Sequence, residues 1–200
     1  MIGNLIDAYN QFSDKERIGI IGSNPTDSVT GIMTYGSQCK QQRWIEERAV
    51  VTSASLMPLA PYRHVGPFRN ELFIDGVDQE YCFRLRREGY HVIVACDAKF
   101  LHSLGYPIAR RFIWRRVIPT NHSALRRYYM TRNRLVIAKE YIHSEFRWVA
   151  LQLLALFKAI VLIVLFESDK AAKLRMVMLG IYDGMTGRMG PHGEDGSVIR

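Results

Sequence analysis

The chain has 200 residues, of which 48% are hydrophobic and 23% are charged. This is the composition of an ordinary globular protein and argues against a disordered chain. Lysine and arginine number 27 against 19 aspartates and glutamates, and the net charge of +8 favours an anionic partner: nucleic acid, an anionic membrane surface or a phosphorylated substrate. The three cysteines, Cys39, Cys82 and Cys96, are odd in number and form no CxxC pair. The sequence therefore predicts neither a disulfide framework nor a zinc site, and a reducing cytosol is the simplest setting.

The first half of the chain has the pattern of mixed helices and strands. Apolar residues recur at helical spacing across residues 1–14, which predicts a short amphipathic helix. Runs rich in β-branched and small residues predict strands, and turn-forming residues separate them. In chain order, the other predicted elements are strands at 18–22 and 49–57, a short helix and turn within 58–67, an extended run at 72–74, a helix near 77–88 and a strand at 91–95.

The character of the sequence changes near residue 106. A basic and aromatic stretch precedes helical patterns near 122–143, 146–166 and 169–186, and a tail rich in glycine follows. We therefore predict an α/β fold class with a helical extension. The expected parts are an α/β region over residues 1–105, a linker over 106–121, a helical region over 122–190 and a flexible tail over 191–200.

Three acids, Asp75, Asp78 and Glu80, gather around a glycine where the helix near 77–88 is expected to begin. Carboxylates in the first turn of a helix are favoured by its exposed N–H groups and its dipole, by about 0.3–1 kcal/mol. One interpretation is therefore that Asp75 caps the helix and the other two acids occupy its first turn. The other interpretation is that the helix start presents a carboxylate to a substrate.

An arginine lies on the apolar stripe of the predicted helix near 122–143. Leu125, Tyr128, Tyr129 and Val136 share that stripe, and Arg132 projects from its middle. A guanidinium on a core-facing stripe is costly unless it is paired, so Arg132 is expected to meet an anion. An internal salt bridge, or an edge position from which the side chain reaches solvent, remains an alternative.

Two further stretches bear on partners. Residues 110–116 mix four arginines with two large aromatic residues, a pattern compatible with nucleic acid, with a lipid interface or with a solvated linker. Residues 148–166 are apolar except for Gln152 and Lys158. A lysine near the centre of a spanning helix costs about 2.5–3.5 kcal/mol. We therefore favour a helix lying on the membrane surface over a spanning helix, with a helix buried in the protein as the alternative.

Several segments together resemble family 2 glycosyltransferases, especially the bacterial rhamnosyltransferase branch. Residues 65–75, VGPFRNELFID, are similar to the family's "GxFdexlFid" segment, and residues 77–86, VDQEYCFRLR, to its "xDxExcxRar" helix. Residues 102–105, HSLG, resemble its "HxxG" segment, and residues 128–133, YYMTRN, its "YyxxRN" motif. The resemblance implies the C-terminal part of a GT-A (Rossmann-like) domain followed by a helical extension.

The resemblance also implies roles for the residues that match. Asp78 occupies the place of the catalytic base, which removes a proton from the acceptor hydroxyl in an inverting transfer. Asp75 and Glu80 are expected to shape the acceptor pocket or to hold the helix start. His102 is expected beside the donor diphosphate, where a neutral imidazole can ligate a divalent metal, Mg²⁺ or Mn²⁺. Arg132 is expected to touch the diphosphate or the acceptor pocket.

The expected partners are a nucleotide-sugar donor of the dTDP-rhamnose type, a glycan or lipid-linked acceptor and a membrane surface, but no nucleic acid. The expected location is cytoplasmic, peripheral to the inner face of the bacterial plasma membrane. The family carries a DxD-like motif in a donor-binding half, and no DxD lies before position 70. We therefore expect a fragment with little activity by itself. A non-catalytic basic module that binds membrane or nucleic acid is the alternative.

Overall fold

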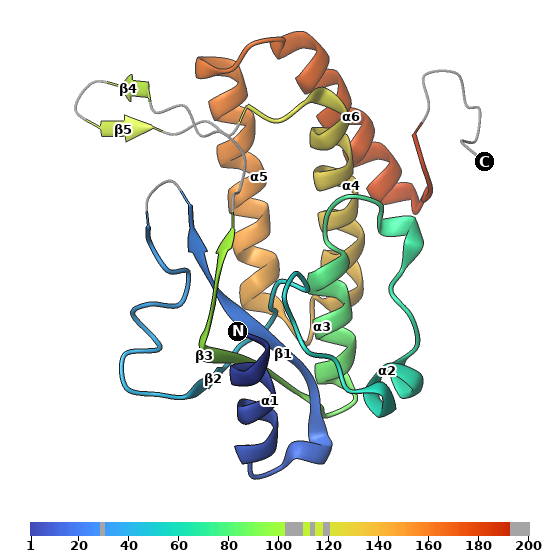
Figure 1. The fold of residues 1–200 in the computed structure, drawn as a ribbon. Helices are drawn as coiled ribbons and strands as arrows, with labels where there is room; N and C mark the ends of the chain where they lie inside the picture. The colour runs from blue at the N-terminus through green and yellow to red at the C-terminus, as the bar shows by residue number, and fades with distance from the viewer. Residues whose placement is uncertain (29–30, 103–109, 113–114, 118–120, 193–200) are drawn as a thin grey trace. The chain divides into compact units, whose positions relative to one another are not determined.

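The computed structural model describes residues 1–28, 31–102, 110–112, 115–117 and 121–192 (Figure 1). The chain divides into two compact units. The first unit comprises Met1–Phe68 and Asp78–Leu104, and the second comprises Arg69–Val77 and Gly105–Arg200. Each unit is therefore built from two separate stretches of the sequence, and the short stretch Arg69–Val77 belongs with the helices of the C-terminal half.

The first unit is centred on a three-stranded mixed sheet. Its strands are β1 (Ile18–Asp27), β2 (Trp44–Glu46) and β3 (His91–His102), in the order β1-β3-β2. β3 runs parallel to β1 and antiparallel to β2. The other elements of this unit are α1 (Ile2–Gln11), the 3₁₀ turn η1 (Lys15–Arg17), α2 (Leu59–Val65) and α3 (Val77–Arg87), whose first residue belongs to the second unit.

Buried apolar side chains cover both faces of this sheet. Successive side chains of a strand point to opposite faces. Val92 and Val94 of β3 pack in one buried cluster with Tyr81, Cys82 and Leu85 of α3. The opposite cluster contains apolar residues of α1, Phe12 just after it, and residues of β1 and β3: Leu5, Ala8, Phe12, Ile18, Ile21, Ile93 and Ala95. The sheet thus separates α1 from α3.

The helix predictions for this unit are confirmed, but the strand predictions are confirmed only in part. β1 and β3 extend well beyond the predicted runs at 18–22 and 91–95. β1 continues through the turn-forming residues 23–27 because pairing with β3 overrides their local preference, and Pro25 is tolerated because β1 is an edge strand. The strand predicted at 49–57 is wrong: only Leu56 forms a bridge, to Ile21. The three-residue strand β2 was not predicted.

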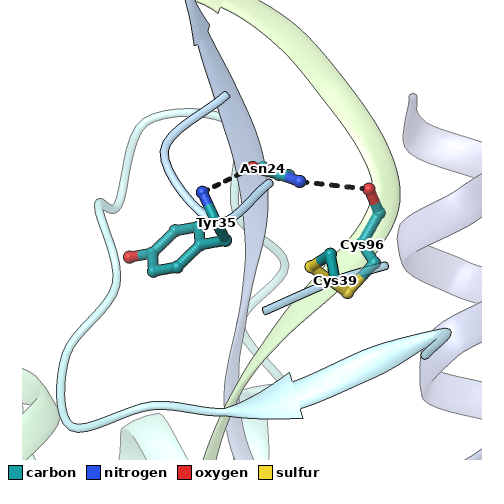
Figure 2. The surroundings of a disulfide bond; sticks show 4 residues. All are labelled: Asn24, Tyr35, Cys39 and Cys96. Carbon is teal, nitrogen blue, oxygen red and sulfur yellow. Dashed lines mark hydrogen bonds between the residues drawn. A yellow bond between two sulfur atoms is a disulfide. The ribbon is translucent and has the colours of Figure 1, made fainter. Parts of the chain in front are cut away.

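The prediction of no disulfide is also wrong. Cys39 and Cys96 are bonded, with their Cα atoms 5.4 Å apart across a sequence separation of 57 residues. Figure 2 shows how the bond is surrounded: Asn24 Nδ2 donates to the Cys96 carbonyl, and the Tyr35 N–H donates to Asn24 Oδ1. The sheet brings these distant segments together, which spacing along the sequence does not reveal.

The second unit contains three long helices, α4 (Ala124–Tyr141), α5 (Phe146–Phe166) and α6 (Lys170–Thr186). All three were predicted, within two residues at either end. It also contains the 3₁₀ turn η2 (Asn70–Leu72) and an antiparallel hairpin of β4 (Arg110–Phe112) and β5 (Arg115–Val117). The hairpin lies where only a linker was expected. The extended run expected at 72–74 is instead the end of η2 and a turn.

Helices α4 and α6 lie side by side at close range (Figure 1). Two glycines of α6 permit this approach. A Cβ on Gly180 would lie 2.7 Å from the Tyr128 carbonyl oxygen, and one on Gly184 would lie 3.0 Å from the Arg132 carbonyl oxygen. Spaced four residues apart on one helix face, they let the two backbones come together in the way that small residues do at tight helix crossings.

A buried ionic cluster joins the ends of the three helices. The Glu167 carboxylate accepts from Arg127 Nη2 at 2.5 Å and from Lys173 Nζ at 3.0 Å. It also accepts from the Asn121 N–H at 3.2 Å, and Lys173 Nζ donates to Asn121 Oδ1 at 2.6 Å. The Glu167 side chain is fully buried. Because each charge has an opposite charge and hydrogen bonds, the cluster can exist away from water.

The surface of α5 is largely apolar and exposed. This helix has 21 residues; its most apolar stretch of 18 residues has a mean hydropathy of 2.7, and 11% of that stretch is buried. Leu154 and Phe157 are 68% and 69% exposed, and only Val149 and Ile163 are buried. By length and composition alone, α5 is the one helix among the described residues that could cross a membrane.

Candidate functional site

Asp78 lies in the first turn of α3 in the first unit and is partly buried. Its Oδ1 accepts a hydrogen bond from Thr52 Oγ1 at 2.6 Å. Within the described residues, no hydrogen bond or ion pair reaches its other oxygen, Oδ2. The single hydroxyl contact orients the carboxylate while leaving acceptor capacity on it. Such a carboxylate can accept a proton from a hydroxyl brought within hydrogen-bond reach.

Thr52, the partner of Asp78, lies in the run 49–57, and its residue type does not by itself indicate a role. That run was interpreted as a strand, in which the threonine would have been an ordinary β-branched residue. The structure instead makes it an irregular segment that returns alongside α3. The Val50 N–H contacts Cys82 Sγ at 3.5 Å, two residues from Thr52. The sequence signal for Thr52 was its place in that run.

Glu80 lies on the same helix as Asp78 but in a different environment. Its side chain is 1% exposed and forms an ion pair of 3.1 Å with Arg84, one helical turn later. Arg84 in turn donates to the carbonyls of Val65 and Pro67. Glu80 thereby links α3 to the end of α2. Contact between Glu80 and an acceptor stays a prediction, and it would require this ion pair to open.

Cys82 is the free cysteine of the described chain and lies on the sheet-facing side of α3. Burial raises the pKa of its thiol to about 12, and the hydrogen bond from the Val50 backbone offsets this only in part. The thiolate is the reactive form of cysteine. Cys82 is therefore a packing residue rather than a nucleophile.

Asp75 and Arg132 both belong to the second unit. The Asp75 backbone carbonyl accepts from Asn133 Nδ2 at 2.6 Å, and its carboxylate lies 3.8 Å from Arg134 Nε. Arg132 is 0% exposed, as its place on the apolar stripe predicted. Asp75 thus lies on the turn just before α3, and Arg132 lies within α4.

The partners of Arg132 differ from the anion that the sequence predicted. Its guanidinium donates to the carbonyls of Glu71 and Gly190 at 2.8 and 2.5 Å and to Asn133 Oδ1 at 3.0 Å. It also lies 5.0 Å from the centre of the Tyr129 ring. Among the described residues these partners are neutral, and they satisfy a buried guanidinium through hydrogen bonds and a cation–π contact. Contact with a diphosphate stays a prediction.

His102 ends β3, where its backbone pairs with Asp27. Its side chain lies outside the described part of the structure, so its predicted roles beside a diphosphate and on a metal stay predictions. No group of three or more His, Cys, Asp or Glu residues that could hold a metal occurs among the described residues. The described side chains therefore do not form a metal site by themselves.

Comparison with known proteins gives one informative similarity. The chain is 30% identical over 143 residues to a dTDP-rhamnosyl transferase, RfbF, of Shigella flexneri. The match covers 70% of this chain and 46% of the relative, so the chain spans about half of the relative's length. No family model matches the chain, and no solved structure matches it. The similarity supports a relationship to glycosyltransferases.

Proposed function

We propose that the chain acts in an inverting glycosyltransferase of family 2 with a GT-A fold, of the rhamnosyltransferase type, in cell-surface glycan synthesis. Its donor is a nucleotide-diphosphate sugar of the dTDP-rhamnose class, and its acceptor is a glycan or a lipid-linked glycan. The observation that carries the proposal is the 30% identity to a dTDP-rhamnosyl transferase. The placement of Asp78 at the start of α3, held by Thr52, supplies a residue for the chemistry.

In the proposed reaction, Asp78 takes the proton of an acceptor hydroxyl as its oxygen attacks the anomeric carbon. The bond from that oxygen to the carbon forms while the bond from the carbon to the diphosphate oxygen breaks. The electron pair leaves with the nucleoside diphosphate, and the proton remains on the Asp78 carboxyl. Because the attack and the departure occur on opposite faces of the sugar, the configuration inverts. Thr52 keeps the carboxylate oriented through its 2.6 Å hydrogen bond.

The charge that develops on the departing diphosphate needs cationic stabilisation. His102 is our candidate next to the diphosphate, and a divalent metal, Mg²⁺ or Mn²⁺, would supply further positive charge there when bound. The net charge of +8 is consistent with an anionic donor. These assignments rest on the family resemblance.

We further propose that α5 brings the protein to the inner face of the bacterial plasma membrane. The support is its exposed apolar surface, including Leu154 and Phe157, in a chain with net positive charge. Flotation with phosphatidylglycerol vesicles tests this proposal. Leu154→Glu should lower the bound fraction, whereas Leu59→Glu, at a leucine of similar exposure (66%) in the first unit, should not. Equal losses for both variants would contradict it.

Turnover of nucleotide sugars is the test of the enzymatic proposal. The chain, alone and joined to any in-frame sequence that precedes it in its gene, is incubated with dTDP-rhamnose, UDP-glucose or GDP-mannose, and release of the nucleoside diphosphate is measured. We expect release from dTDP-rhamnose in preference to the other two. The anomeric configuration of the product, read by NMR, should be opposite to that of the donor.

No turnover of any donor by either form would contradict the enzymatic proposal. It would favour the alternative of a non-catalytic basic module, for which the exposed surface of α5 favours a membrane over nucleic acid. Transfer with retained configuration would keep the glycosyltransferase class but remove the role given to Asp78, because retention needs a covalent intermediate or a different geometry.

A further inference from the structure

The turn that ends two residues before Asp78 has an uncommon backbone. Ile74 has φ +77° and Gly76 has φ +86°. A β-branched residue with positive φ is a true outlier, and such strain persists only where the surroundings impose it. This turn belongs to the second unit. The contacts that hold the turn in this conformation therefore come from the same unit, which contains α4.

Asn133 of α4 holds this turn through a single amide nitrogen. Its Nδ2 donates to the carbonyls of Leu72 at 2.8 Å, Phe73 at 3.3 Å and Asp75 at 2.6 Å. Asn133 itself is 0% exposed, so water cannot replace these bonds. Three carbonyls that converge on one buried donor fix the path of the backbone on both sides of Ile74.

Arg132 fixes the orientation of that amide. Its Nε donates to Asn133 Oδ1 at 3.0 Å, which assigns the oxygen to the side of the guanidinium and the nitrogen to the side of the turn. Its Nη2 donates to the Glu71 carbonyl at 2.8 Å, at the start of the same segment. The guanidinium, the amide and four successive or near-successive carbonyls thus form one connected network.

Gly76 lets the turn approach α4. A Cβ at this position would lie 2.8 Å from Ile137 Cδ1 and 3.5 Å from Asn133 Cβ. Positive φ also favours glycine there. Backbone conformation, side-chain space and hydrogen bonding therefore agree on a single geometry for the residues that lead into α3.

We propose that Arg132 and Asn133 are positioning residues for Asp78. They fix the turn at 71–76, and the backbone of this turn continues directly into Val77 and Asp78, the first two residues of α3. The proposal rests on the function proposed above for Asp78. It gives Arg132 a role through the backbone of the turn instead of a role as a ligand of the diphosphate.

Asn133→Asp is the most selective test, since it keeps the shape of the side chain and removes the donor that the three carbonyls need. Asn10→Asp, the same change at an exposed position of α1, is the matched control. Hydrogen–deuterium exchange of peptides covering residues 72–78 should become at least tenfold faster in Asn133→Asp and stay unchanged in Asn10→Asp. With dTDP-rhamnose, kcat should fall by about 10²-fold, the effect of a misplacement near 1 Å, while KM changes less than threefold.

A second variant protects the test against misfolding of α4. Gly76→Ala leaves α4 intact and should produce the same fall in kcat and the same faster exchange. Arg132→Lys, which keeps the charge but loses the fork of donors, should lower kcat in the same way if Arg132 positions the turn. If Arg132 instead binds the donor diphosphate, its replacement should raise KM.

Two results would overturn the proposal. The first is unchanged exchange at 72–78 in both Asn133→Asp and Gly76→Ala. The second is faster exchange with unchanged kcat, which would separate the turn from catalysis. Absence of any turnover by the unaltered protein would count against the function proposed for Asp78. The exchange measurement would then still decide whether Asn133 holds the turn.

Discussion

The two units use carboxylates in opposite ways. In the first unit, Asp78 is partly buried and Thr52 supplies its one described hydrogen bond. In the second, Glu167 is fully buried and is contacted by Arg127, Lys173 and the Asn121 N–H. A carboxylate whose lone pairs accept hydrogen bonds from buried cations holds helices together. It has little acceptor capacity left for the proton of a substrate. One with unused acceptor capacity can exchange a proton. Charge alone therefore does not indicate function; the number and kind of partners do.

The largest effect on stability is expected from removing the buried carboxylate. Glu167→Ala leaves the charges of Arg127 and Lys173 in a buried place without the anion that both contact. Breaking a buried ion pair in this way costs about 3–5 kcal/mol of unfolding free energy. Urea unfolding followed by circular dichroism measures it, with the exposed Glu16→Ala as control. A loss of unfolding free energy below about 1 kcal/mol would contradict the structural role given to Glu167, and with it the difference between the two carboxylates.

A smaller loss is expected where α4 and α6 meet. Gly180→Ala places a methyl group 2.7 Å from the Tyr128 carbonyl oxygen, and overpacking of this kind costs about 1–3 kcal/mol. Gly3→Ala is the matched control: a Cβ there meets nothing within 4 Å, so the better helix propensity of alanine should stabilise α1 slightly. The same unfolding measurement serves both variants, and stabilisation by Gly180→Ala would contradict the close approach of the two helices.

The smallest effect concerns pH and the surroundings of the ionic cluster. Burial, together with the nearby charges of Arg126 and Arg127, lowers the pKa of His122 to about 4. The unfolded chain therefore binds a proton at His122 near pH 6.5 while the folded chain does not, so this residue makes stability fall as the pH drops from about 6.5 to 4. His122→Asn should lose that contribution. The urea midpoint of the unaltered protein should fall more between pH 7 and pH 4.5 than the midpoint of His122→Asn. Equal falls in the two proteins would contradict the assignment.

The fold and the site were predictable to different degrees, for physical reasons. The helices α4, α5 and α6 carry long apolar patterns, so their positions follow from periodicity alone. β2 has three residues and exists because β3 offers it an edge, and the Cys39–Cys96 bond exists because the sheet brings distant segments together. Neither leaves a local signal. The burial of Arg132 followed from its stripe, but its partners did not, because carbonyls of a distant turn are invisible in a helix pattern.

Asn133 and Thr52 show the same limit within the candidate site. Asn133 belongs to the motif at 128–133 and Thr52 to the predicted strand at 49–57, but the sequence indicated a role for neither, because an amide or a hydroxyl acts through the atoms that it contacts. Asn133 meets three carbonyls of the turn, and Thr52 meets Asp78. Asp78 itself was predicted from its position at a helix start and from family resemblance. Both signals can be read directly from the order of residues in the sequence.

The most direct test of the account is to measure stability and turnover together in Asp78→Asn. This variant keeps the size of the side chain and its hydrogen bond with Thr52 but removes the base. The account predicts that the urea midpoint stays within error of the unaltered protein, while nucleoside diphosphate release from dTDP-rhamnose in the presence of acceptor falls by about 10²–10⁴-fold, the usual contribution of general base catalysis. Unchanged turnover, or a large loss of stability like that expected for Glu167→Ala, would contradict it.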